Sequence, residues 1–344
     1  MTESGIECSS SKSREGFLVP DPVDNIEPDT DPSVYEDSAL GAFDPSSTTS
    51  ISSSILNFKY ENGRRYSGDR AAEYVLPNDE KEQDRLDLSH HVFRMVLGGA
   101  LYRCPLPPNL TNILDIGTGT GIWAIDIADE FPSASAIGCD LSPIQPSWVP
   151  PNCQFEVDDV EKPWSYSKRF DFIHGRALAG SIEDWPRLFA RAYENLEPGG
   201  WLELQDFEVW AYSDDGTLEK ATNSILWRDK TLEASEKFGK DMRVVHKYAD
   251  MMKEAGFVDI VDDVYKVPLA PWPKDKRLKE IARYEQLVML ESVEAYSLAL
   301  FTRVLGWSHE EVQILVASVK NEIKDLSIHS YGKMHFVYGR KPIE

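Results

Sequence analysis

The sequence predicts an α/β fold in which a doubly wound, mainly parallel sheet carries helices on both faces. Strand-like and helix-like segments alternate between residues 109 and 212, and a glycine-rich turn follows the first of these strands. Strands separated by helices connect through crossovers, which place the helices over the faces of a parallel sheet. With 344 residues, 42% of them hydrophobic, the chain can form one large domain of this class with additions, or two small domains.

The segments of this core are bounded by residues that end regular structure. Pro132 ends the first predicted helix, and Pro186 lies near the start of the second, where proline is tolerated. Pro198-Gly199-Gly200 ends the second helix before the last strand of this region. The predicted helices are 121–131 and 185–196, and the predicted strands are 112–116, 135–139, 153–157, 170–174 and 201–210.

Segments on both sides of the core are expected to add helices to it. Apolar residues recur at roughly helical spacing in 80–102, which predicts a helix docked on the core. Beyond the core, the pattern predicts helices over 217–238, 244–255 and 308–325, and strands over 257–267 and 333–338. We therefore divide the ordered chain into an N-terminal cap segment (51–108), a core (109–212), and a helical substrate-side region with the last strands (213–344).

The first 50 residues have a different composition from the rest. They contain 11 acidic and two basic residues, many serines and prolines, and few large apolar groups. Such a segment cannot bury enough apolar surface to offset the entropy lost on ordering, so we expect it to be disordered. A passive tail and a phosphorylatable regulatory tail are both consistent with this composition.

Composition and charge exclude several classes of function. The net charge of −22 disfavours a nucleic-acid partner, because such binding needs basic groups that neutralise phosphates. No run of 18 apolar residues is present, so no membrane span is expected, and the N-terminus lacks the apolar stretch of a secretory signal. The four cysteines form no CxxC pair, which argues against a zinc site or a disulfide framework and favours a reducing compartment.

The strongest motif lies between the first core strand and the following helix. Asp115 precedes Gly117, Gly119 and Gly121 in a D-x-G-x-G-x-G pattern. Glycines permit a tight turn and close approach of a ligand to the backbone, at the edge where open α/β sheets bind ligands. A dinucleotide site requires G-x-G-x-x-G, but position 122 here is Ile. The acidic residue before the glycines suits a ligand with an ammonium and a sulfonium, so we expect S-adenosyl-L-methionine rather than NAD(P).

Two further acids follow the next two strands. Asp140 ends the second strand, where a carboxylate can accept protons from both ribose hydroxyls. Asp159 follows the third strand, where it can accept from an adenine amino group while the Val160 N–H reaches a ring nitrogen. Any one of these acids could be a solvated loop residue, but all three at the correct strand ends predict a nucleoside site.

Seven stretches of the sequence resemble the fungal LaeA-like methyltransferases, over about residues 55–341. They are ENGRRY, YVLPNDEKEQDRLDLSHH, LDIGTGTGIWAIDIADEFP, IGCDLSPIQPSWVPPNCQFEVDD, FDFIHGR, LEPGGWLELQD and HSYGKMHFVYGRKP. The resemblance implies a class I methyltransferase (Rossmann-like) core of seven strands, S-adenosylmethionine as cofactor, and a role in fungal secondary metabolism. It supports the cofactor roles given above to the glycines and the three acids.

The resemblance leaves two functions open. Some relatives look like tailoring enzymes, which implies O- or N-methylation of a small molecule by a cytoplasmic enzyme. Others look like nuclear regulators of secondary metabolism that act with partner proteins. The N-terminal segment lacks a basic nuclear-import run, which favours the first function.

Catalytic residues are expected at the carboxyl ends of the strands, because that edge faces the ligand. His174, after the fourth strand, falls where the resemblance implies contact with the methionine end, so it is the first candidate for proton transfer. Arg65 and Tyr66 could close over the cofactor through its carboxylate and sulfonium, and Tyr74 could join them; packing on the core is the alternative. The remaining candidates are Arg176, Gln205, Asp206, His329 and Tyr331.

Overall fold

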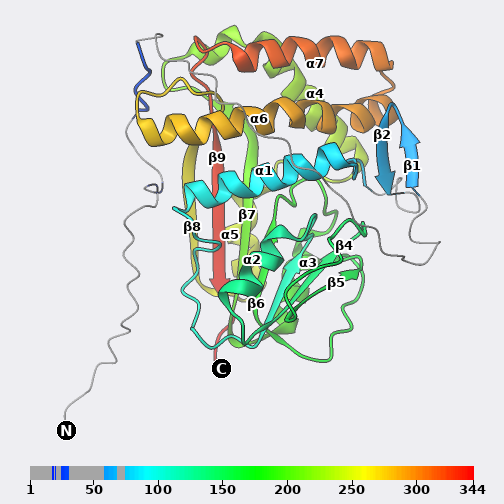
Figure 1. The fold of residues 1–344 in the computed structure, drawn as a ribbon, viewed down its shortest axis with the longest axis vertical. Coiled ribbons are helices and arrows are strands. Elements are labelled where there is room, and N and C mark those ends of the chain that lie inside the picture. Colours follow the sequence, from blue (N-terminus) through cyan, green and yellow to red (C-terminus); the bar gives the residue numbers. More distant parts are fainter. Residues whose placement is uncertain (1–17, 19, 21–24, 31–57, 68–73) are drawn as a thin grey trace.

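A computed structural model describes residues 18, 20, 25–30, 58–67 and 74–344 (Figure 1). Its centre is a seven-stranded sheet in the order β5-β4-β3-β6-β7-β9-β8, in which only β9 runs antiparallel to its neighbours. This sheet confirms the predicted fold class. Its strands are β3 (Asn112–Ile116), β4 (Ser135–Asp140), β5 (Cys153–Val157), β6 (Phe170–Arg176), β7 (Leu196–Tyr212), β8 (Val258–Pro268) and β9 (Tyr331–Arg340).

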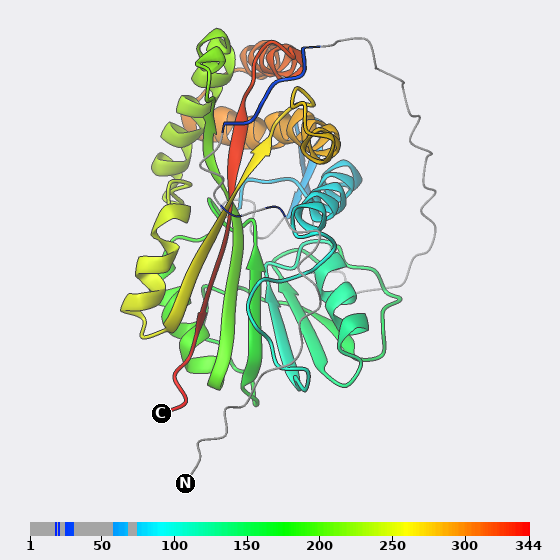
Figure 2. The same cartoon turned by 90° about the vertical axis from the view of Figure 1, so that its left-hand side faces the viewer.

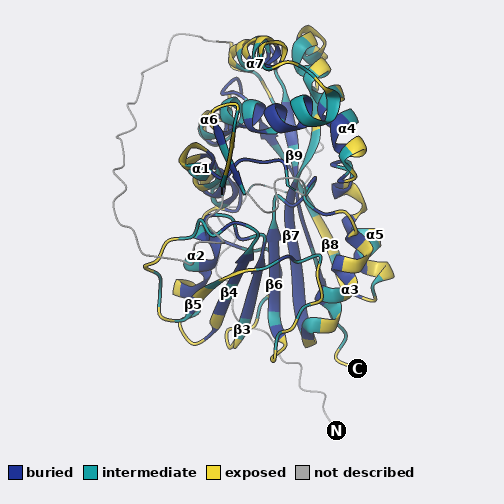
Figure 3. Ribbon diagram, turned by 90° about the vertical axis from the view of Figure 1, so that its right-hand side faces the viewer, coloured by how far each residue is buried: buried dark blue, intermediate teal, exposed yellow. Residues whose placement is uncertain are grey.

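Helices cover both faces of this sheet. On one face, α2 (Ile122–Glu130) buries Trp123 and Ile127 against β3 and β4. On the other face, α3 (Trp185–Asn195) and α5 (Tyr248–Glu254) pack in a second apolar cluster with β6 and β7. Figure 2 shows the sheet between these two layers, and Figure 3 shows that its central strands are buried.

A helical layer lies beyond the carboxyl ends of the parallel strands. In Figure 1, β7 and β9 extend past the shorter strands into this layer, so that the sheet and the helices share one core. Its short elements are β1 (Phe58–Glu61), β2 (Arg64–Ser67), the 3-10 helix η1 (Thr217–Lys220) and the π-helical segment η3 (Leu300–Leu305). The 3-10 helix η2 (Val245–Lys247) instead leads into α5 and packs in the cluster on the sheet face. Its long helices are α1 (Glu80–Val96), α4 (Thr222–Phe238), α6 (Lys276–Ala299) and α7 (His309–Lys324).

Helix boundaries follow local capping chemistry. Asp79 accepts from the Glu82 N–H at the start of α1, and Ser308 and Glu311 form the capping box that the sequence predicts for α7. The apolar pattern of the sequence does not predict α6, although Asp275 caps its first turn by accepting from the Leu278 N–H. No helix among the described residues is long and apolar enough to cross a membrane.

Part of the acidic N-terminal segment contacts the folded domain. The Asp29 N–H donates to the Trp272 carbonyl at 2.7 Å, and the Lys274 N–H donates to the Glu27 carbonyl at 2.8 Å. Pro28 and Pro273 form an isolated bridge between these two segments. Residues 25–30 therefore differ from the expected disorder, because they pair with backbone groups that are distant in sequence. Most of the segment 1–50 lies outside the described residues.

Candidate active site

The glycine motif forms a tight loop between β3 and α2. Gly117, Gly119 and Gly121 all have positive φ, at 65°, 58° and 83°. A Cβ atom on Gly117 would lie 2.5 Å from Leu178 Cδ2, and one on Gly121 would lie 2.3 Å from the Phe155 ring. Both the backbone conformation and the neighbouring side chains therefore require glycine at these positions.

Asp115 is buried near the end of β3, and its side chain contacts both the glycine loop and the neighbouring strand β6. Its carboxylate accepts from Thr118 Oγ1 at 2.6 Å and contacts His174 Nδ1 at 2.7 Å. The His174 ring is fully buried and stacks on Trp123, with ring centroids 3.6 Å apart. His174 lies within β6, directly opposite Asp115 on the neighbouring strand β3. The sequence pattern instead predicts His174 just after this strand. Its Nε2 atom is buried without a hydrogen-bond partner in the described structure.

Asp140 lies at the carboxyl end of β4, directly beside the glycine loop. Its Oδ2 atom accepts from the Gly119 N–H at 2.9 Å, and its Oδ1 atom accepts from the Ser142 N–H at 2.9 Å. Burial raises the pKa of this carboxyl to about 6, although the two backbone donors oppose the shift. Asp140 thus holds the loop and keeps further lone pairs for a ligand.

Asp159 and Val160 follow β5, where the sequence analysis expects the adenine contact. Asp159 is buried, and its Oδ1 atom accepts from the Glu161 N–H at 2.9 Å. The Val160 carbonyl accepts from Trp164 Nε1 and from Arg191. These bonds fix the backbone of this turn.

The structure gives Arg65 and Tyr66 packing roles, which differs from the expectation that they close over the cofactor. Arg65 donates to Glu80 at 2.6 Å and to the Asn78 carbonyl at 2.6 Å, so its guanidinium is already bound. Tyr66 is buried in the helical layer, and the Arg303 guanidinium lies 4.6 Å from its ring centroid. Neither residue lines the cavity described below.

Tyr74 lies at the start of the described segment 74–344 and, like Arg65 and Tyr66, is not part of the cavity lining. Burial, followed by the charge of Asp140, raises the pKa of its phenol well above the usual value.

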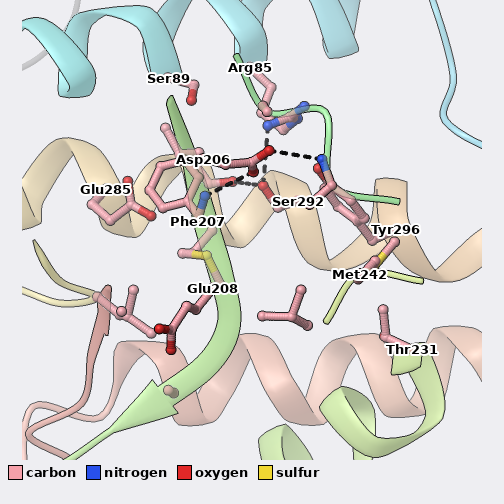
Figure 4. A pocket seen from close by; sticks show the side chains of 18 of the residues that line it. Arg85, Ser89, Asp206, Phe207, Glu208, Thr231, Met242, Glu285, Ser292 and Tyr296 are labelled. Atoms are coloured by element: carbon pink, nitrogen blue, oxygen red, sulfur yellow. Dashed lines mark hydrogen bonds between the residues drawn. The ribbon is translucent and has the colours of Figure 1, made fainter. Parts of the chain in front are cut away.

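A cavity of about 230 Å³ begins at the glycine loop and extends into the helical layer (Figure 4). At the loop end it is lined by Asp115, residues 117–120 and His174, and farther up by Phe207–Ala211 of β7. Side chains of α1, α4, α6 and α7 close the rest of it. Asp140 and Asp159 are not part of the lining, so the cavity meets the loop at the Asp115 side.

The other sequence candidates divide into two groups. Arg176 and Asp206 line the cavity. Asp206 accepts from the Leu178 and Ala179 N–H groups, each at 2.9 Å, and burial raises its pKa to about 6. The candidates that do not line the cavity are Gln205, which donates to the Leu101 carbonyl, His329, which pairs with Asp215, and Tyr331, which donates to Asp214.

Polar side chains of α4 and α6 line the upper cavity, which is the part between the helices and away from the glycine loop. They are not among the candidates that the sequence predicts. They project inward among apolar neighbours, as the labelled side chains of Figure 4 show. Because α6 is not predicted from the sequence, no pattern singles out its inward residues. These side chains are Thr231, Glu285, Ser292 and Tyr296.

Known proteins are similar to this chain in sequence and in fold. A family model described as "Methyltransferase domain" matches residues 72–261. Methyltransferase pytC of Aspergillus terreus is 45% identical over 324 residues, which cover 94% of this chain and 98% of the relative. Secondary metabolism regulator LAE1 of Cochliobolus heterostrophus is 38% identical, over 82% of this chain and 94% of the relative. Protein-methionine methyltransferase laeA of Emericella nidulans is 39% identical, over 83% of this chain and 77% of the relative.

One similar solved structure is phosphoethanolamine N-methyltransferase 2 of Haemonchus contortus in complex with S-adenosyl-L-methionine. It matches with a TM-score of 0.41 and 19% sequence identity. The match covers 78% of this chain and 54% of that chain. The family model and the relatives agree with the D-x-G-x-G-x-G loop and confirm S-adenosylmethionine as the cofactor. The chain therefore belongs to the fungal family of S-adenosylmethionine-dependent methyltransferases of secondary metabolism that includes pytC and the laeA regulators.

Proposed function

We propose that this methyltransferase modifies a small, mainly apolar molecule, at oxygen or nitrogen, inside the cavity. The supporting observation is the continuity of the cavity from Asp115 and the glycine loop to the space between α4, α6 and α7. A molecule there would have one end at the loop, while its body contacts side chains such as Trp227, Val288 and Met289. A mainly apolar lining with a few polar groups is typical of small-molecule sites.

The residues around the loop suit the cofactor, which supplies an electrophilic methyl group when bound. We assign its ammonium to Asp115, its ribose hydroxyls to Asp140, and its adenine edge to Asp159 and the Val160 N–H. The three acids lie at the carboxyl ends of three adjacent strands, with Asp115 in β3, Asp140 the last residue of β4, and Asp159 just after β5. Asp140 is joined to the loop through the Gly119 N–H. Of the three loop glycines, Gly119 leaves the backbone open to close approach, because an added Cβ there would meet only Leu86 Cδ1.

His174 combines a positioning role with a free acceptor atom. When Nδ1 donates to Asp115, the neutral ring keeps Nε2 as its acceptor. Nε2 has no partner in the described structure, and the ring lines the loop end of the cavity. We assign His174 to hold Asp115 in place and to accept a proton or hydrogen bond at this end of the cavity.

A second candidate function is regulation of secondary metabolism within a protein complex. It is favoured by relatives that are named secondary metabolism regulators at 38% identity. The name of another relative describes methyl transfer to protein methionine. In this chain the cavity lies among buried side chains, which suits a small molecule better than an exposed segment of another protein.

Metabolite profiling of a deletion strain separates the two functions. We expect loss of one methylated product or family of products, with accumulation of the form that lacks the methyl group. Complementation with the wild-type gene is the control. Broad loss of metabolites from several pathways, without a desmethyl intermediate, would contradict the small-molecule proposal and support the regulator.

A further inference from the structure

Glu285 is a buried acid in the upper cavity that has an unsatisfied oxygen. It lies on α6, it is only 2% exposed, and it lines the cavity. Its Oε2 atom is buried and has no hydrogen-bond partner in the described structure, and no dashed line reaches its carboxyl in Figure 4. Burial raises its pKa to about 8, although the positive charge of Arg85 opposes the shift.

The other charged groups that line the cavity are already bound within the protein. Arg85 donates to Glu82 at 2.6 Å, for example, so its guanidinium does not neutralise Glu285 through a direct bond. The remaining pairs are Asp115 with His174, Arg176 with His90, Asp206 with the Leu178 N–H, Glu208 with His335, Arg228 with Asp229, and Glu322 with Ser224. Glu285 is thus the charged side chain of the described cavity that lacks an internal partner.

An unpartnered carboxyl in this position is unfavourable for folding. Removing a polar group from water without a compensating hydrogen bond costs free energy, and the cost is larger when the group is ionised. Thr231, on α4, presents a second such group, because its Oγ1 atom is buried without a partner and lines the same cavity. The two orphaned oxygens therefore indicate that the ligand carries polar groups that would satisfy them.

We propose that Glu285 recognises a hydrogen-bond-donating group, an amine or a hydroxyl, on the apolar substrate, with Thr231 as a second polar contact. This inference rests on the small-molecule function proposed above. A carboxylate substrate is disfavoured, because it would either repel an ionised Glu285 or keep Glu285 protonated while its own negative charge is removed from water.

An ammonium and a hydroxyl differ in whether their binding makes Glu285 release a proton. An ammonium group pairs best with an ionised carboxylate, so its binding near pH 7 makes the Glu285 carboxyl release a proton to the solvent. A neutral hydroxyl can bond to the carboxyl without this release. The number of protons released on binding therefore tells the two donors apart.

Three naphthalene probes test the proposal: 2-naphthylmethylamine, 2-naphthylmethanol and 2-naphthoate. Calorimetry on protein saturated with S-adenosylhomocysteine should show that the amine or the alcohol binds at least about tenfold more tightly than the naphthoate. Glu285→Leu should abolish this preference. Glu285→Gln should keep binding of the alcohol within roughly threefold but lose the amine preference and its proton release, because an amide accepts a hydrogen bond without carrying charge.

The control is Glu280→Gln, because Glu280 is a half-exposed acid on the same helix that does not line the cavity. This variant should bind all probes like the wild type. An unchanged preference in Glu285→Leu, or failure of all three probes to bind, would overturn the inference. Binding of S-adenosylhomocysteine is measured first on every variant. Its absence in the wild type would overturn the proposed function instead.

A second measurement tests the buried carboxyl without any substrate. Because the pKa of Glu285 is raised in the folded state, the folded protein holds a proton that the unfolded chain releases at intermediate pH. Its contribution to stability is complete below about pH 4.5 and is lost as the pH rises through about 8. The melting temperature of Glu285→Gln should therefore exceed that of the wild type increasingly with pH, by at least about 2 °C at high pH. Parallel curves for the two proteins would contradict an unpartnered Glu285.

Discussion

A folded Gly119→Val variant is expected to lose cofactor binding, with an affinity for S-adenosylhomocysteine at least about 100-fold below that of the wild type. The residue has a φ of 58°, a conformation that a β-branched side chain rarely adopts. A Cβ atom at this position would meet only Leu86 Cδ1, at 3.4 Å, so the protein itself leaves room for it. The added side chain would therefore occupy the space through which the ligand approaches the loop, and calorimetry measures the loss.

Gly306→Val is the matched control for this prediction. Gly306 also has positive φ, at 74°, and an added Cβ would meet no atom within 4 Å. It ends η3, outside the loop and the cavity lining, so its variant carries similar backbone strain without touching the ligand. We expect it to lose stability but to bind S-adenosylhomocysteine normally. Wild-type affinity in folded Gly119→Val would show that the cofactor lies elsewhere.

The parts of the fold that depend on short stretches of sequence could be predicted. The D-x-G-x-G-x-G loop requires its glycines because of local backbone geometry, and Pro132 and Pro186 bound the neighbouring helices through their own rings. Asp115 and Asp140 could be placed because a carboxyl end of a parallel strand faces the ligand edge wherever the strand is correctly identified. Each of these features depends on residues that are close to it in the sequence.

Helix α6 could not be predicted because its buried stripe contains polar residues. Ile281, Glu285, Val288, Ser292 and Ala295 are all buried at helical spacing. Glu285 and Ser292 interrupt the apolar periodicity at the positions that line the cavity. Glu285 and Ser292 thus line the proposed substrate site and also break the apolar pattern from which this helix would be predicted.

The roles of Arg65 and Tyr66 depend on partners that are not their neighbours in the sequence. Arg65 is bound by Asn78 and Glu80 across the turn before α1, and Tyr66 packs with Arg303, which is more distant in the chain. From the sequence alone, the stretch ENGRRY is equally compatible with a ligand contact. Only the three-dimensional arrangement shows that the Arg65 guanidinium is hydrogen-bonded within the protein and that the Tyr66 ring is buried beside Arg303.

Substitution of Asp140 tests the nucleoside side of the site. Asp140→Ala should weaken binding of S-adenosylhomocysteine by about 30–150-fold, or ~2–3 kcal/mol, because two hydrogen bonds from the ribose to a charged acceptor are lost and water replaces them only in part. The substitution also frees the Gly119 and Ser142 N–H groups, which the carboxylate holds at 2.9 Å. Isothermal calorimetry measures the loss.

The same prediction has a pH dependence with a definite sign. The pKa of Asp140 is raised to about 6 without ligand, whereas ribose hydroxyls donate best to the ionised form. Binding therefore requires loss of the proton, so wild-type affinity should fall as the pH falls through about 6. Asp140→Ala should not show this dependence. A flat wild-type profile would contradict the ribose contact.

Asp159→Ala removes one contact to the adenine amino group and should cost about tenfold in affinity. Asp140 and Asp159 are assigned to different parts of one rigid ligand, so the loss in the double variant should be close to the product of the two single losses. Neither acid is placed near the methyl group, so S-adenosylmethionine and S-adenosylhomocysteine should be affected equally. Glu156→Ala is the control, because Glu156 is an exposed acid on β5. If Asp140→Ala binds both ligands like the wild type, the end of β4 does not hold the ribose, and the nucleoside must lie against another strand.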